Sequence, residues 1–164
     1  MFALLAWKFS TDLAVLAPSW LAAAGLPLTV LDLRQRRLPN WLVLPAYPVV
    51  IGFVAVDAAV SCEPWSLVRS IAGMAIFAIF VGVLYWIFGN RQGVGGGDIK
   101  LAGVVGAVLG QSGWGPFSTG MVASWFLAAI VLLPLRVLHA ADEKTDMAFD
   151  PFLLAGAGVT LLIP

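Results

Sequence analysis

Long stretches without a charged residue, separated by short polar segments, are the dominant pattern of this sequence. A bilayer core of about 30 Å requires roughly 20 helical residues to cross it. Residues 13–31, 41–61, 70–90 and 101–135 approach or exceed this length, with a single aspartate inside the second stretch. The last stretch is too long for one span and is interrupted at 111–116 by glycine and proline, so it predicts two helices. With a final apolar stretch at 151–164, the pattern predicts about six transmembrane helices.

The composition places the chain in the same class. Hydrophobic residues make up 61% and charged residues 11% of the sequence, whereas soluble domains carry about 25% charged residues. The mean hydropathy of +0.97 exceeds what one water-soluble core could bury. No charged segment precedes the first apolar run, so we expect this run to be retained rather than cleaved as a signal peptide. We therefore expect an all-α integral membrane protein, with residues 1–164 forming a single domain.

Charge and cysteine content exclude several classes of function. Lysine plus arginine and aspartate plus glutamate each number 9, so the net charge of zero provides no general attraction for nucleic acid. Cys62 is the one cysteine and His139 the one histidine. These two residues cannot form an internal disulfide or a cysteine-rich zinc cluster. We therefore expect no metal and no cofactor.

Most cationic residues fall in the loops that follow the first, third and fifth spans. These residues are Arg34, Arg36, Arg37, Arg91, Lys100, Arg136 and Lys144. Lys8 and Arg69 lie on the opposite face if the spans alternate. Because cationic loops remain in the cytoplasm, the pattern predicts a multi-pass protein of the cytoplasmic (inner) membrane with its N-terminus outside.

Two aspartates lie at helix ends on the same predicted face. Two spans separate Asp32 from Asp98, so both are expected at the cytoplasmic side, where ionisable groups near membrane depth indicate function by default. Each also has a structural interpretation: Asp98 stands where an N-cap before Ile99 would stand, and Asp32 can be an interfacial charge beside arginines. A helix over 99–110 rises only about 18 Å, which places Asp98 below the membrane surface unless that helix continues further.

A pair of carboxylates can activate water. Two close carboxyl groups do not ionise together easily, so the pair holds one acid beside one base. The base takes a proton from the attacking water, and the acid protonates or hydrogen-bonds the scissile carbonyl oxygen. The glycines that precede Asp98 allow an extended substrate backbone to approach closely. If Asp32 and Asp98 work together, the pair is therefore suited to hydrolysis by an activated water at the cytoplasmic face.

At these positions the chain resembles the type IV prepilin peptidases, membrane aspartic proteases of the GxGD class. The resemblance covers nearly the whole chain beyond the first span and rests on Asp32, on Pro39-Asn40, on the segment 95–101 and on 149–153. It implies that Asp32 and Asp98 are the catalytic pair. It also implies a set of substrate-positioning residues: Pro39, Asn40, Gly95, Gly96, Gly97 and Lys100.

The same resemblance implies the substrate. The family removes a short basic leader peptide from pilin or pseudopilin precursors at the cytoplasmic membrane face, in pilus biogenesis and protein secretion. Long members also methylate the new N-terminus and carry paired CxxC motifs. This chain has one cysteine, so it resembles a short form with peptidase activity alone. The late motif usually reads Pro-Phe-Gly-Pro-Phe and here contains Asp150 in place of the glycine, an additional carboxylate of open role.

Other residues have competing interpretations. The arginines after the first span are expected to fix the topology and to contact anionic lipid headgroups. Lys100 can orient or electrostatically tune Asp98, and a lysine that reaches for the interface explains it equally well. Ala102, Gly106 and Gly110 recur at four-residue spacing, which predicts a face of small residues for close helix packing in lipid.

Two other functions compete with prepilin cleavage. One is a small transporter or channel component, in which Asp32, Asp57 and Asp98 would bind ions or protons. The other is an intramembrane protease of the presenilin type, which shares GxGD but cuts within a substrate's span. The Pro39-Asn40 turn and the segment after Asp98 favour the prepilin peptidase over both.

Overall fold

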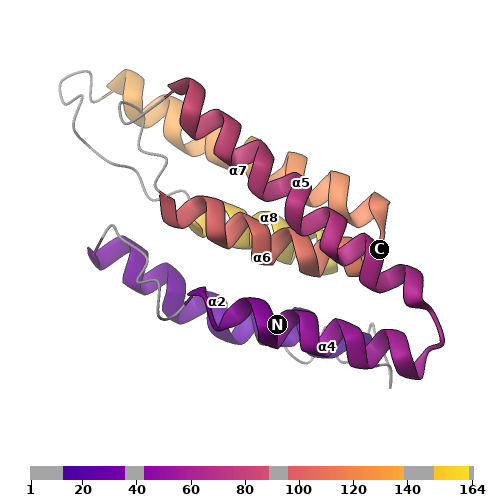
Figure 1. Ribbon diagram of the computed structural model, residues 1–164. Helices are drawn as coiled ribbons and strands as arrows, with labels where there is room; N and C mark the ends of the chain where they lie inside the picture. The colour runs from indigo at the N-terminus through magenta and orange to yellow at the C-terminus, as the bar shows by residue number, and fades with distance from the viewer. Residues whose placement is uncertain (1–12, 36–42, 89–95, 139–149, 163–164) are drawn as a thin grey trace.

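The computed structural model describes residues 13–35, 43–88, 96–138 and 150–162 (Figure 1). Within these ranges the chain is helical apart from short turns, and no strand occurs. The elements are η1 (Leu13–Val15), α2 (Leu16–Gln35), α4 (Ala46–Val60), α5 (Pro64–Phe88), α6 (Gly96–Ser112), α7 (Trp114–Leu138) and α8 (Asp150–Leu162). The prediction of an all-helical protein with about six major helices is confirmed.

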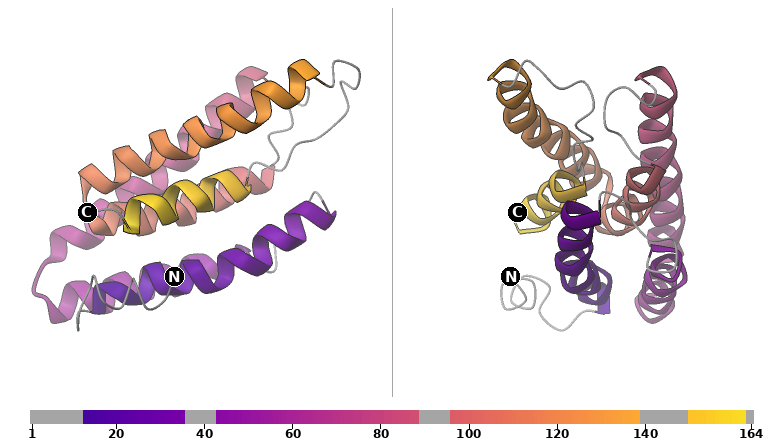
Figure 2. Two further views of the ribbon diagram at one scale, coloured as in Figure 1. Left: turned by 180° about the vertical axis from the view of Figure 1, so that it is seen from behind. Right: turned by 90° about the vertical axis from the view of Figure 1, so that its left-hand side faces the viewer.

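The helices lie roughly along one axis, and their ends fall at two opposite ends of the bundle. α2, α5 and α7 end on the left of Figure 1, where α6 and α8 begin. The turns that join α4 to α5 and α6 to α7 lie at the other end (Figures 1 and 2). Consecutive helices thus run in opposite directions, which agrees with helices that cross a bilayer back and forth.

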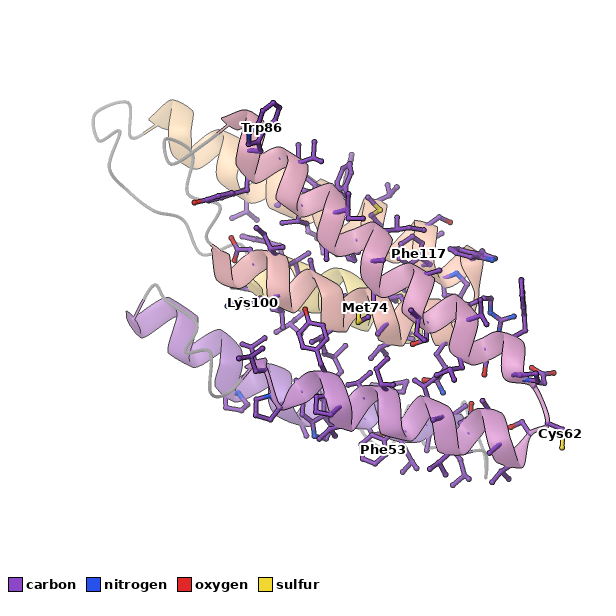
Figure 3. The ribbon with its side chains drawn as sticks, viewed as in Figure 1. Phe53, Cys62, Met74, Trp86, Lys100 and Phe117 are labelled. Carbon is purple, nitrogen blue, oxygen red and sulfur yellow. The ribbon has the colours of Figure 1, made fainter. Side chains whose placement is uncertain are left out.

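Two helices carry outward faces suited to lipid. Pro64–Trp86 in α5 and Trp114–Val131 in α7 are long and apolar enough to span a bilayer, and Leu13–Gly25, Ala46–Val60 and Pro151–Leu161 are shorter apolar helices. Side chains such as Ile79, which is 64% exposed, and Phe126, which is 67% exposed, project from these two helices. Trp86 projects from the outer side of α5 (Figure 3). Exposed apolar side chains on helices of this length agree with contact to lipid.

Helix α6 occupies the centre of the bundle. Every residue from Leu101 to Gln111 is buried, and α6 contacts α2, α4, α5, α7 and α8. The view along the bundle shows α6 among the other helices (Figure 2). A helix that is apolar on all sides is stable only when it is covered on all sides. The short helix expected after Asp98 is therefore the core helix of the molecule.

The closest helix pair is α5 with α6, and small residues make this approach possible. A side chain at Gly106 would overlap the carbonyl of Gly73, and a Cβ atom at Gly110 would lie 2.5 Å from the carbonyl oxygen of Arg69. The hydroxyl of Ser70 donates a hydrogen bond of 2.8 Å to the carbonyl of Ala107. The packing face predicted from the four-residue spacing is confirmed at Gly106 and Gly110, because both lie against the α5 backbone.

Some helix boundaries differ from the sequence expectation. α2 continues three residues beyond Asp32 to Gln35, and α5 begins at Pro64 instead of residue 70. Proline suits the first turn of a helix, and Arg69 fits inside α5 because its guanidinium donates to the Gln111 carbonyl at 3.3 Å. The predicted interruption at 111–116 is confirmed, since Gly113 has a φ of +126° between α6 and α7.

Candidate active site

Asp98 lies in the first turn of the central helix. α6 begins at Gly96, so Asp98 is the third helical residue and not the cap before Ile99, and that structural interpretation was wrong in its detail. The side chain is 5% exposed. A carboxylate in a first turn faces the positive end of the helix dipole. The fold therefore places an ionisable group inside the protein where the α6 backbone offers partial compensation for its burial.

Asp32 lies in the last turn of α2, at the same end of the bundle as Asp98. α2 contacts α6, and the end of α2 and the beginning of α6 face the same way in Figures 1 and 2. The structure describes Asp32 through its backbone. The two helix ends thus lie at one end of the bundle, as the even number of spans requires, and the direct pairing of the two carboxyl groups stays a prediction.

The predicted positioning residues are only partly within the described chain. Gly96 and Gly97 form the beginning of α6 and are helical, not part of an extended loop. Lys100 follows in the next turn and is half-buried, at the beginning of α6 in Figure 3. Pro39, Asn40 and Gly95 lie outside the described residues. Asp150 is the first residue of α8.

A tyrosine that sequence reasoning did not select contacts this region. The hydroxyl of Tyr47 in α4 donates a hydrogen bond of 2.7 Å to the backbone carbonyl of Lys100. The chain contains two tyrosines, and a buried phenol usually finds a hydrogen-bond acceptor. That tendency was the available signal, although sequence alone could not identify the acceptor.

Asp57 is the second buried aspartate of the described chain, and it lies elsewhere. Its carboxylate, 6% exposed, accepts a 3.0 Å hydrogen bond from the side-chain amide of Gln111 and a long one of 3.5 Å from Ser61. Ser61 adjoins Cys62, which Figure 3 shows at the end of the bundle away from Lys100. Asp57 and Asp98 therefore lie toward opposite ends of the bundle and do not form one cluster.

A metal site was not expected here. Among the residues that the structure describes, no three His, Cys, Asp or Glu side chains come together to hold a metal ion.

Comparisons with known proteins agree on one family. The sequence model of the Type IV leader peptidase family matches residues 15–137. A protein of Pseudomonas putida named prepilin leader peptidase/N-methyltransferase is 25% identical over 163 residues, which cover 96% of this chain and 53% of that protein. The protein of the same name from Aeromonas hydrophila is 29% identical over 163 residues, with 90% and 51% covered.

The chain spans about half the length of these curated relatives. No solved structure matches it significantly. The family match covers α2 to α7 almost completely and includes both Asp32 and Asp98. The chain is an all-helical membrane protein that belongs to the Type IV leader peptidase family.

Proposed function

We propose that this chain is an aspartic endopeptidase that removes the leader peptide from type IV prepilin-like precursors at the cytoplasmic face of the inner membrane. One observation carries the proposal: Asp98 is buried in the first turn of the central helix α6, at the bundle end where α2 carries Asp32. The family supplies the reaction class, since its relatives are named prepilin leader peptidases. Those names give prepilins as the substrates of the relatives; for this chain we propose pilin or pseudopilin precursors with a basic leader, as the family resemblance implies.

In this proposal the two aspartates share one proton. Two carboxyl groups that are close together favour the singly ionised pair. The ionised member accepts a proton from a water molecule as that water attacks the scissile carbonyl, and the protonated member donates to the carbonyl oxygen. The proton then passes to the leaving amine, which completes hydrolysis of the peptide bond. Neither a metal nor a cofactor is needed.

The surroundings of Asp98 suit this chemistry. Electrostatic interactions are stronger in a site that excludes water than in bulk solvent, and Asp98 is buried beside the N-terminal end of α6. The adjacent Gly96 and Gly97 carry no side chain that would obstruct an extended substrate backbone. We assign Pro39, Asn40, Gly95 and Lys100 to the same task of positioning the leader, on the strength of the family motif.

The proposed orientation follows from charge. Arg34, Arg36, Arg37, Arg91, Lys100, Arg136 and Lys144 belong to segments at one membrane face if the helices alternate. Cationic loops favour the cytoplasmic side, where they also contact anionic lipid headgroups. The site would then face the compartment in which precursors are made, the N-terminus would lie outside, and residues 1–164 would act as one peptidase domain.

Substitution of the aspartates tests the proposal. Asp32→Asn and Asp98→Asn should each abolish leader cleavage, because an amide can act neither as the base nor as the shared acid. Asp57→Asn is the matched control: Asp57 is as buried as Asp98 but lies with Gln111, and an Asn side chain still offers an oxygen to that amide. The measurement is leader loss from a precursor co-expressed with each variant, normalised to the amount of membrane-inserted protein.

The competing functions give different results in this experiment. Normal cleavage by Asp32→Asn or Asp98→Asn would refute the catalytic pair. A transporter that used all three aspartates would lose flux in every variant, with no proteolysis in the wild type. A presenilin-type protease would cut within the apolar helix of the precursor instead of after its leader, which mass spectrometry of the product distinguishes.

A further inference from the structure

Tyr47 bridges α4 and α6, the central helix that carries Asp98. Its hydroxyl donates to the carbonyl of Lys100 at 2.7 Å, across 53 positions of sequence. Lys100 lies two residues after Asp98, within the first two turns of α6. A backbone carbonyl has two lone pairs, so it can accept from Tyr47 and still take part in the helix. α4 is thereby attached to the end of α6 that carries Asp98.

The chain leaves space for this contact at Gly103. A side chain at Gly103 would overlap the Tyr47 hydroxyl and would come within 3.2 Å of the ring carbon Cζ and 3.3 Å of Cε1. Gly103 is helical and buried, where glycine is otherwise a poor helix former. The phenol ring of Tyr47 therefore packs against α6 in the space that a side chain at position 103 would otherwise fill.

The places of α4 and α6 in the chain explain why the Tyr47–Lys100 hydrogen bond matters for the candidate site. Among the described elements α4 follows α2, whose last turn holds Asp32, and the two helices are in contact. The Tyr47 bond thus connects a helix that contacts α2 with the beginning of the helix that holds Asp98. Catalysis by a carboxyl pair depends on its geometry, since a displacement of about 1 Å can lower a rate by about a hundredfold.

We propose that Tyr47 is a positioning residue for the peptidase: its hydroxyl, seated over Gly103, fixes α4 against the beginning of α6 and so holds Asp98 in register with the end of α2. This inference rests on the proposed function. Tyr47 acts through the backbone of Lys100 and does not contact the reacting atoms. Its loss should therefore lower the rate of the chemical step and leave leader binding unchanged.

The test measures steady-state cleavage of a precursor by purified protein in detergent or nanodiscs. Tyr47→Phe removes one oxygen and keeps the ring, so kcat should fall by about tenfold, the effect of about one hydrogen bond, with KM unchanged. Tyr85→Phe is the matched control, because Tyr85 is the other tyrosine and is exposed on α5. The control should retain the wild-type kcat and KM.

A double-mutant cycle with Gly103→Ala tests the geometry itself. Gly103→Ala alone should lower kcat, because the new methyl group displaces the Tyr47 hydroxyl. In the Tyr47→Phe background the same substitution should have a smaller effect, since the hydroxyl it collides with is gone. Contacting residues give such non-additive results, whereas independent ones add. Additive losses in kcat would overturn the proposal.

The remaining outcomes separate the two proposals. A Tyr47→Phe variant with a lower melting temperature but wild-type kcat would show that the contact is only structural, and the positioning role would be wrong. That result leaves the proposed function intact if Asp98→Asn is inactive in the same assay. If Asp98→Asn cleaves normally, or if the wild type does not cleave, the proposed function is wrong and the positioning role falls with it.

Discussion

At the scale of single residues, the two buried aspartates have different surroundings. Asp98 lies in the first turn of α6, and Asp57 lies near the other end of that helix, where it accepts from the Gln111 amide. The Oε1 of Gln111 and the Nε of Arg69 have no hydrogen-bond partner among the described residues. In the cluster of Asp57, Gln111 and Arg69, some polar atoms therefore lack a hydrogen-bond partner. The cluster depends on the 3.0 Å hydrogen bond from Gln111 to Asp57.

Substitutions in this cluster should change the stability of the protein without changing its catalytic activity. Gln111→Met keeps the side-chain volume but leaves the Asp57 carboxylate buried without its 3.0 Å donor. Loss of a donor to a buried group costs about 1–3 kcal/mol, so the melting temperature in detergent should fall. Asp57→Leu combined with Gln111→Met removes both partners and should recover most of the loss. A single mutant as stable as the wild type would contradict the assignment.

At the scale of helices, the close packing of α5 on α6 determines where the site can form. Both helices approach through Gly73, Gly106 and Gly110, with backbone atoms where side chains usually lie. Without a hydrophobic force between helices in lipid, such close contact supplies much of the association energy. α6 is held in this way along its middle and last turns, and nearer its beginning it is bonded to α4 through Tyr47.

A larger residue at the contact between α5 and α6 should push the two helices apart. Gly106→Ala would place a methyl group against the Gly73 carbonyl and 2.8 Å from Cβ of Phe77, and overpacking of this kind costs about 1–3 kcal/mol. Gly52→Ala is the matched control, because a Cβ atom there meets nothing within 4 Å. It should be neutral or stabilising by up to about 1 kcal/mol. Equal unfolding midpoints for the two variants in denaturant would show that the close approach contributes nothing.

At the scale of the whole molecule, the two ends of the bundle differ in chemistry. One end brings together the end of α2 and the beginning of α6 and α8, with Asp32, Asp98 and Asp150 on these segments. The other end contains the α4–α5 turn with the exposed Cys62. If the candidate site faces the cytoplasm, Cys62 must face the outside.

The single cysteine makes this orientation measurable. A membrane-impermeant maleimide should label Cys62 in spheroplasts, because the thiol is exposed at the end opposite Lys100 (Figure 3). A Cys62→Ser, Gln92→Cys variant should be labelled only after the membrane is permeabilised, since residue 92 belongs to the predicted cytoplasmic loop. The reverse labelling pattern would invert the proposed topology.

Sequence alone was sufficient to predict an all-helical chain with about six helices, and to predict that the helix ends carrying Asp32 and Asp98 lie at the same end of the bundle. These properties depend on where charges and apolar runs fall relative to the thickness of a bilayer, which can be measured along one dimension. The break between α6 and α7 was predictable for a similar reason, because Gly113 is a local signal. The motif around Asp98 was sufficient to identify the family.

Only the tertiary structure decided which helix lies at the centre and which polar groups meet. The expected short helix is the core helix α6, Asp98 lies inside its first turn, Tyr47 binds Lys100 across 53 positions, and Gln111 binds Asp57 across 54. In a chain that is apolar almost everywhere, hydrophobicity does not distinguish a lipid-facing surface from a protein-facing one. The choice between them depends on which small residues let two backbones approach, and that is a property of helix pairs and not of any segment alone.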